Sequence, residues 1–261
     1  MNRLPTLFVS HGSPMFAVEP GIAGPQLAQL GRELRENVKA VLVLSPHWMT
    51  RGVSVTTTDA PPTIHDFGGF PDVLYTLRYP APGSPAVAAR ALELLNADGW
   101  NASADPSRGL DHGAWVPIMH LFPDAQVPVV QVSLPQSMDA EAAVRLGRSL
   151  APLADEGVLI VGSGSITHNL YEVFREPVTD GAAYAKEFVD WARSSVAGHD
   201  EGALVDYLKR APHAKRAHPT SEHYLPLPFA FGAARRDYDA KVLDGGSTHG
   251  GVLAMDAYVF Q

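Results

Sequence analysis

The sequence contains no cysteine among its 261 residues. This absence excludes disulfide frameworks, thiolate zinc fingers, iron–sulfur clusters and cysteine nucleophiles. Basic residues are also few, because 20 Lys and Arg stand against 28 Asp and Glu and give a net charge of -8 at pH 7. Such a charge repels nucleic acid and anionic membrane surfaces. We therefore expect neither as a partner, and any chemistry must use nitrogen and oxygen groups.

Long hydrophobic runs are missing as well. No apolar run approaches the length needed to cross a bilayer, and the short stretch at 6–9 is followed at once by Ser10 and His11, so we expect no signal peptide and a cytoplasmic protein. The composition, 46% hydrophobic and 18% charged, is typical of a folded globule. The length fits one large α/β domain. With no repeat or linker in the sequence, we expect a single domain over residues 1–261.

Apolar strand-like segments alternate with amphipathic helical segments along the chain, which predicts an α/β fold with a central, mostly parallel or mixed sheet flanked by helices. Segment 53–57 alternates as an edge or hairpin strand would, and the Pro- and Gly-rich stretch 59–83 is long enough to suggest a loop that serves a site. Ser84 is placed to cap the next helix. The expected buried strands are 7–9, 40–44, 128–134, 157–161 and 251–260, and the expected helices include 24–37, 113–122 and 139–153.

Histidines follow three of the expected strands. His11 lies two residues past the first strand, His47 three past the second, and His168 follows strand 157–161 through a Gly-Ser-Gly-Ser turn. The carboxyl ends of parallel strands meet at one edge of a sheet, so these imidazoles are expected to converge on a metal site there. Each one alone can equally cap a turn or bond a backbone carbonyl.

His223 is a fourth candidate ligand, and Glu222 lies beside it. Adjacent residues on a helix point about 100° apart, so only one of these two is expected to bind a shared ion. A site of imidazoles with at most one carboxylate suits Zn²⁺ or Fe²⁺. Zinc would activate water for hydrolysis, whereas ferrous iron with open positions would bind O₂.

Seven segments of the sequence resemble the class III extradiol ring-cleaving dioxygenases, and most closely the branch of DOPA 4,5-dioxygenases. They are FVSHGSPM (8–15), LSPHW (44–48), PPTIHDFGGFP (61–71), YPAPGSP (79–85), DHGAW (111–115), SGSITHNL (163–170) and HPTSEHYLPL (218–227). The resemblance implies an enzyme that opens the aromatic ring of a catechol such as L-DOPA with O₂. It also implies one divalent metal per chain, Fe²⁺ for ring cleavage or Zn²⁺ as in related bacterial proteins.

The resemblance assigns His11, His47 and His223 as metal ligands, and His168 as a further ligand or as an acid/base group. The wider class uses two His and one carboxylate, so Glu222 remains an alternative to His223. Ring cleavage needs a group that accepts a catechol proton and later returns one, and imidazole suits this step because its pKa lies near the working pH. His168 or His112 would serve.

The substrate is expected to meet His65, Phe67, Ser13 and Trp115, which lie in the matched segments. Packing explains two of these segments equally well: Asp111 could cap a helix with Trp115 in the core, and His65 and Phe67 could lie in an ordinary turn. A zinc hydrolase and a non-catalytic metal-binding protein on the same fold are the alternatives in function. The sequence leaves the side chain of the catechol and the oligomeric state open.

Overall fold

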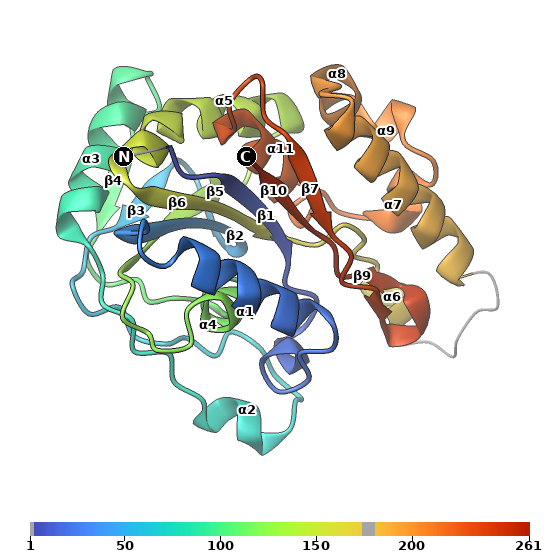
Figure 1. Cartoon of the computed structure of the whole chain (residues 1–261), viewed down its shortest axis with the longest axis horizontal. Helices are drawn as coiled ribbons and strands as arrows, with labels where there is room; N and C mark the ends of the chain where they lie inside the picture. The colour runs from blue at the N-terminus through green and yellow to red at the C-terminus, as the bar shows by residue number, and fades with distance from the viewer. Residues whose placement is uncertain (1–2, 174–180) are drawn as a thin grey trace.

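The computed structural model describes residues 3–173 and 181–261, and its central feature is one eight-stranded sheet (Figure 1). The strand order in that sheet is β4-β3-β5-β2-β6-β1-β10-β7, and β8 and β9 form a separate ladder. The bounds are β1 Thr6–Ser10, β2 Ala40–Thr50, β3 Ser54–Thr56, β4 Ser103–Asp105, β5 Val129–Pro135, β6 Val158–Gly164, β7 Ala240–Leu243, β8 Ser247–Thr248, β9 Leu253–Ala254 and β10 Ala257–Phe260.

The middle of the sheet is parallel, and its margins are mixed. Strands β5, β2, β6 and β1 run parallel to one another, whereas β10 pairs antiparallel with β1 and β7 antiparallel with β10. Every residue of β1, β5 and β6 is buried, as expected for parallel strands covered on both faces. The predicted α/β fold with a mostly parallel or mixed sheet is therefore confirmed.

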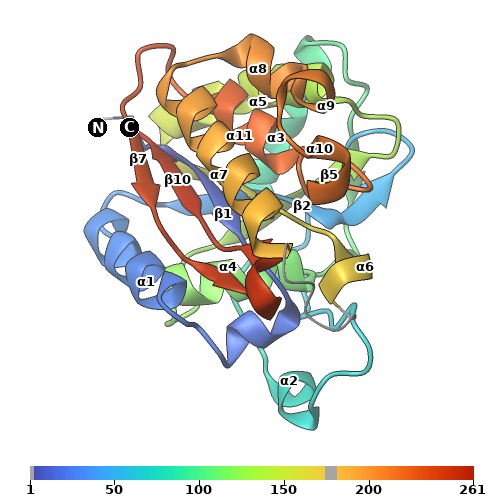
Figure 2. The same ribbon diagram turned by 90° about the vertical axis from the view of Figure 1, so that its right-hand side faces the viewer.

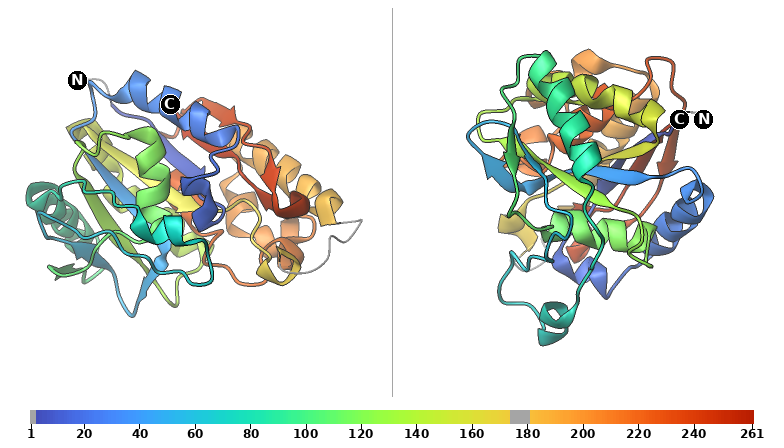
Figure 3. Two further views of the ribbon diagram at one scale, coloured as in Figure 1. Left: turned by 90° about the horizontal axis from the view of Figure 1, so that it is seen from below. Right: turned by 90° about the vertical axis from the view of Figure 1, so that its left-hand side faces the viewer.

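Helices cover both faces of this sheet (Figures 1 and 3). Successive residues of a strand point to opposite faces, and β2 shows this clearly: Leu42 and Leu44 belong to one buried cluster, Val41 and Val43 to the other. Helix α4 packs on β2 beside α1 and covers one face, while α11 packs on β6 and α5 and covers the other. Figure 2 shows α7 in front of α11 on that second side.

The remaining bounds complete the description of both layers. The helices are α1 Ala23–Leu34, α2 Asp72–Thr76, α3 Pro85–Ala97, α4 His112–Leu121, α5 Ala140–Leu150, α6 Leu170–Val173, α7 Gly181–Ala197, α8 Glu201–Val205, α9 Tyr207–Arg210, α10 Ala214–Ala217 and α11 Pro226–Ala233, with 3-10 turns at Pro14–Ala17, Ala151–Glu156 and His249–Gly251. None of the described helices is long and apolar enough to span a bilayer.

Two helix starts confirm the sequence-based expectations. The Ser84 hydroxyl accepts a hydrogen bond from the N–H of Val87, and the Asp111 carboxylate accepts one from the N–H of Ala114. Both caps satisfy backbone donors that have no partner within the helix. The stretch 59–83 is largely irregular as expected, but it contains the short helix α2.

Four expected strands differ from the structure. Strand β6 does not end at Val161 but continues to Gly164, so Gly162 and Ser163 lie in the strand and not in a turn before His168. Strand β2 does not end at Leu44 but continues to Thr50, so His47 lies within it; the register against β5 shifts between Leu44 and Met49, and such a bulge redirects side chains. Strand β3 is not an edge or hairpin strand, because it lies between β4 and β5. Segment 251–260 is not one strand, since β9 and β10 are separated within it.

Candidate metal centre

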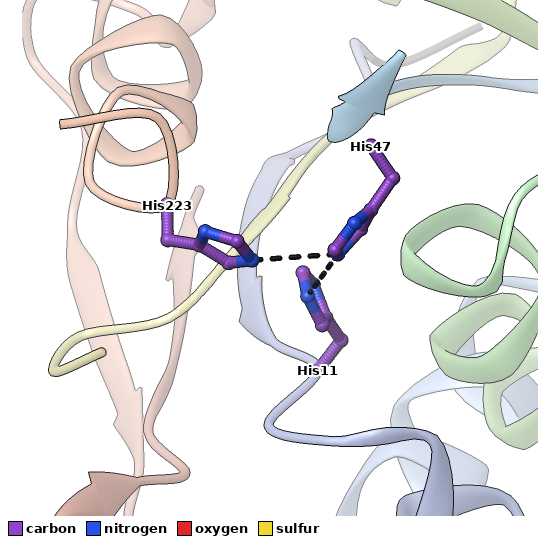
Figure 4. Close-up of side chains that lie close together, drawn as sticks. All are labelled: His11, His47 and His223. Carbon is purple, nitrogen blue, oxygen red and sulfur yellow. Dashed lines mark hydrogen bonds between the residues drawn. The ribbon is translucent and has the colours of Figure 1, made fainter. Parts of the chain in front are cut away.

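Three histidine rings meet beyond the carboxyl ends of the central strands (Figure 4). His11 follows β1, His47 lies in β2 within the segment where the register shifts, and His223 lies just before α11. The Nε2 atom of His47 lies 3.1 Å from Nε2 of His11 and 3.3 Å from Nε2 of His223. The sequence-based expectation that these distant imidazoles converge agrees with this geometry.

The outer nitrogens of two rings determine where their protons lie. The Ser163 hydroxyl donates to the carbonyl of Gly113 at 2.5 Å, so it accepts from Nδ1–H of His11 at 2.9 Å. In the same way, a carboxylate oxygen of Glu222 accepts from Nδ1–H of His223 at 3.1 Å. A neutral imidazole carries one N–H only, so Nε2 of both rings presents a lone pair to the centre.

The backbone of His47 is fixed by a buried polar network. The hydroxyl of Ser45 accepts from the N–H of His47 at 3.2 Å and donates to Asp111 at 2.7 Å. Arg108 donates to the carbonyl of His47 at 3.1 Å, and Gln131 donates to the other oxygen of Asp111. Burial raises the pKa of Asp111 from its usual value, although these donors oppose that rise.

Burial also keeps the three rings neutral. It lowers the pKa of His47 to about 3, with the neighbouring His112 adding to the effect. Burial first, and then the other imidazoles, lower the pKa values of His11 and His223 well below the usual value. Neutral imidazole is the form that binds metals.

The three nitrogens fit a divalent ion. A bond of about 2.0–2.1 Å from each imidazole nitrogen to one ion puts the nitrogens roughly 3.0–3.4 Å apart, and the two measured separations, 3.1 and 3.3 Å, lie in that range. Nε2 of His47 lies within hydrogen-bond distance of the lone pairs of His11 and His223, so a cation bound there would replace a proton that these rings share. A set of three protein ligands leaves positions open for substrate, as catalytic sites do.

His168 lies against this group. Its ring stacks on that of His223 with centroids 3.4 Å apart and planes 8° from parallel, and burial lowers its pKa to about 4. The ligand atoms of His168, Glu222 and His223 lie within 4.8 Å of one another, so among the described residues they form a second group that could hold an ion, beside the group of His11, His47 and His223. Its role as ligand or as acid/base group stays a prediction.

His112 lies on the other side of His47. The ring centroids of His47 and His112 are 4.0 Å apart, and those of His11 and His112 are 5.5 Å apart. Asp66 accepts from both the backbone N–H of His112, at 2.8 Å, and its Nδ1–H, at 3.0 Å. Sequence reasoning missed Asp66, although it stands directly after His65 in a matched segment.

The four expected substrate residues differ in their surroundings. Phe67 lies edge-on to His112 with centroids 5.6 Å apart, and Ser13 is half-buried two residues after His11. The ring nitrogen Nε2 of His65 contacts the carbonyl of Leu77 at 3.0 Å. Trp115 is fully buried and donates its indole N–H to the carbonyl of Ile64, which agrees with the packing interpretation, and a contact with substrate stays a prediction.

Another buried histidine lies behind the site. His218 bonds the carbonyl of Ile166 at 2.8 Å through Nε2, and its ring packs on aromatic side chains rather than orienting a ligand. The Nδ1 atom of His223 instead contacts Glu222. Glu222 is thus the hydrogen-bond partner of the His223 ring.

Comparisons with known proteins find several that this chain resembles over most of its length. A family model described as the catalytic LigB subunit of aromatic ring-opening dioxygenase matches residues 5–260. The chain is 41% identical to a 4,5-DOPA dioxygenase extradiol of Beta vulgaris, over 99% of this chain and 97% of that protein. It is 39% identical to a protein of the same name from Escherichia coli K12, over 89% of this chain and 86% of that protein. A solved structure of an uncharacterized Escherichia coli K12 protein superposes with a TM-score of 0.79 at 31% identity, covering 99% of this chain and 100% of that chain.

Proposed function

This chain belongs to the LigB family of aromatic ring-opening dioxygenases, and on that premise we propose that it opens the ring of L-DOPA, or of a closely related catechol, between carbons 4 and 5. The expected enzyme class, an extradiol ring-opening dioxygenase, is confirmed. That class uses a small molecule and O₂ as substrates. It favours neither the zinc hydrolase nor the non-catalytic metal-binding protein that the same histidines allow.

The observation that carries the proposal is the convergence of three Nε2 atoms, with the lone pairs of His11 and His223 facing Nε2 of His47. Members of the family depend on a metal, and His11, His47 and His223 would hold one divalent ion here. We assign this ion as Fe²⁺ for ring cleavage, with Zn²⁺ as the alternative that the same nitrogens accept. When bound, ferrous iron supplies the open positions and the redox chemistry that bring catechol and O₂ to reaction.

The residues around the three ligands would handle protons. The Nδ1–H of His112 is engaged by Asp66, so its Nε2 lone pair is available to take a proton from a catechol hydroxyl and to return it later. His168 is neutral through burial and offers a second such group on the side of His223. Glu222 holds the ring of His223 rather than replacing it.

The irregular stretch 59–83 would form the substrate side of the site. Phe67 would cover the catechol ring and exclude water, because it already lies edge-on beside His112. His65 and Ser13 would meet the polar groups of the substrate. Trp115 would act by supporting the stretch through its bond to Ile64.

The proposal is tested with protein purified without O₂, stripped of metal and then loaded with Fe²⁺ or Zn²⁺. We expect a yellow ring-opened semialdehyde from L-DOPA only when Fe²⁺ and O₂ are both present. Catechol without the amino acid side chain is the matched substrate control. Absence of ring opening from any catechol in the iron-loaded protein, or hydrolysis that persists without O₂, would overturn the proposal.

A further inference from the structure

The carboxylate of Asp66 accepts two hydrogen bonds from a single residue, His112. One carboxylate oxygen accepts the backbone N–H of His112 at 2.8 Å, and the other accepts its Nδ1–H at 3.0 Å. The Asp66 side chain is only 18% exposed, and that of His112 only 7%. A carboxylate with both oxygens committed to the same neighbour leaves that ring little freedom to rotate.

The bond at Nδ1 fixes the proton on the His112 ring. An ionised carboxylate only accepts hydrogen bonds, so Nδ1 must carry a hydrogen, and in the neutral ring Nε2 then has none. Both oxygens of Asp66 face N–H groups of His112, which is the arrangement that a carboxylate satisfies as acceptor only.

We propose that Asp66 is a positioning residue that holds His112 as the Nδ1–H tautomer, with its Nε2 lone pair ready to receive a substrate proton. The inference rests on the proposed proton-transfer role of His112. It adds a residue to that step which touches neither the substrate nor the ion. Histidine bases elsewhere are oriented by a carboxylate at Nδ1 in the same manner.

Asp66 also lies near His47, 3.6 Å from its Nδ1 atom. The Nε2 atom of His47, on the other side of that ring, is the atom that faces His11 and His223. A carboxylate at Nδ1 is thus separated from the three-nitrogen centre by the imidazole itself. Asp66, His47 and His112 also bring ligand atoms within 4.8 Å of one another, so the metal content of an Asp66 variant is part of the test below.

The neighbours of Asp66 hold it in place. The ring of Phe67 packs edge-on against His112, at 90°, and the carbonyl of Ile64 accepts the indole N–H of Trp115 from α4. The irregular stretch is therefore tied to α4 on both sides of Asp66. Since His112 begins α4, the carboxylate and the ring it orients belong to one packed unit.

Asp66→Asn tests the inference with little change in shape. An amide has one accepting oxygen, so it can satisfy the backbone N–H of His112 only by turning its NH₂ group toward Nδ1. That group donates, so we expect the ring to switch to the Nε2–H tautomer. We expect kcat to fall about 10²- to 10⁴-fold, with KM and metal content changed much less.

The tautomer is read directly from the ¹⁵N chemical shifts of the His112 ring in the zinc-loaded protein, which requires no turnover. Asp66→Glu keeps an accepting carboxylate, so we expect it to retain the Nδ1–H tautomer and recover much of kcat. Asp59→Asn is the control, because it makes the same change at an exposed position of the same stretch. In a His112→Ala background, Asp66→Asn should have almost no further effect on kcat.

Distinct results would overturn the inference. An unchanged His112 tautomer in Asp66→Asn, or a fall in kcat that is fully additive with His112→Ala, would remove the positioning role. If Asp66→Asn no longer holds one equivalent of metal per chain, Asp66 is a metal ligand instead. If no catechol is cleaved by the wild-type protein, the proposed function fails, and the ¹⁵N shifts still decide what Asp66 does to His112.

Discussion

Ser163→Ala removes the hydroxyl that holds the His11 ring in place. That hydroxyl accepts from Nδ1–H of His11 and donates to the carbonyl of Gly113, and Ser163 is fully buried. Without it the ring can rotate, or move its proton to Nε2 and lose the lone pair that faces the other imidazoles. We therefore expect the variant to bind metal more weakly.

The structure sets the size of this loss. Removing a group that orients a ligating histidine weakens metal binding by about 10- to 100-fold, which corresponds to about 1.4–2.7 kcal/mol. The donor of His11 and the acceptor of Gly113 are also left without their partner, at a cost of about 1–3 kcal/mol each in folding stability if no water replaces the hydroxyl. The two effects are separable because only the first depends on metal.

Chelator competition at fixed pH measures the affinity of the variant for Zn²⁺ and Co²⁺, and urea unfolding in EDTA measures its stability without metal. Ser165→Ala is the matched control. Ser165 is also fully buried, and its hydroxyl donates to the carbonyl of Thr167 at 2.7 Å. We expect Ser165→Ala to lose stability but to keep its metal affinity.

A metal affinity of Ser163→Ala within roughly twofold of the wild type, alongside an equal loss of stability in both variants, would refute the reasoning. It would mean that the packing of the buried rings orients His11 without the hydrogen bond. An equal loss of affinity in Ser165→Ala would also refute it, because the effect would then come from general loosening.

Three other predictions follow from the site. His47→Ala should lose both metal and activity, whereas His168→Ala should keep metal and lose turnover if its role is proton transfer, as metal analysis and single-turnover assays will show. Gly113→Ala would place a Cβ against the hydroxyl of Ser45, 2.8 Å from Cδ2 of His47 and 3.3 Å from Cε1 of His11. Ser45 and the two rings must then shift, and chelator competition should show weakened metal binding. Burial lowers the pKa of His218 to about 4, so on acidification this histidine takes up its proton in the unfolded chain before it does so in the folded protein. The metal-free protein should therefore lose about 2 kcal/mol of unfolding free energy from this group between pH 7 and pH 5. Urea titrations at the two pH values measure the loss.

Each of these outcomes has a clear opposite. Metal loss in His168→Ala would make that histidine a ligand, and full metal affinity in Gly113→Ala would mean that the backbone moves to admit the methyl group. For His218, the stability it contributes is fully present above pH 6.5 and disappears as the pH falls toward 4. Equal urea midpoints at pH 7 and pH 5 in EDTA would contradict that direction.

The sequence predicts the centre of the fold well because its signals there are strong and local. Unbroken apolar runs mark β5 and β6 as buried on both faces, and histidines after such runs meet once the strands are parallel. This reasoning placed His11 near its partners. It placed His47 correctly for a partly incorrect reason, since β2 continues through that residue and a register shift, invisible in the sequence, directs the ring.

The residues that orient the imidazoles were not predictable in the same way. Asp66 lies in an irregular stretch, where no periodicity relates sequence position to direction in space. Ser163 reads as one more small residue at the end of a strand, and only its distances to His11 and Gly113 give it a role. A hydrogen bond between residues far apart in the chain depends on the completed fold.

The separations along the chain between the converging rings, 36 residues from His11 to His47 and 176 from His47 to His223, have a consequence for biosynthesis. A nascent polypeptide that has not yet reached position 223 carries two of the three converging rings and lacks the third. Binding of one ion by all three nitrogens, as we propose it, would therefore require that His223 has been synthesised, and the bound ion would then link segments that were made far apart in time.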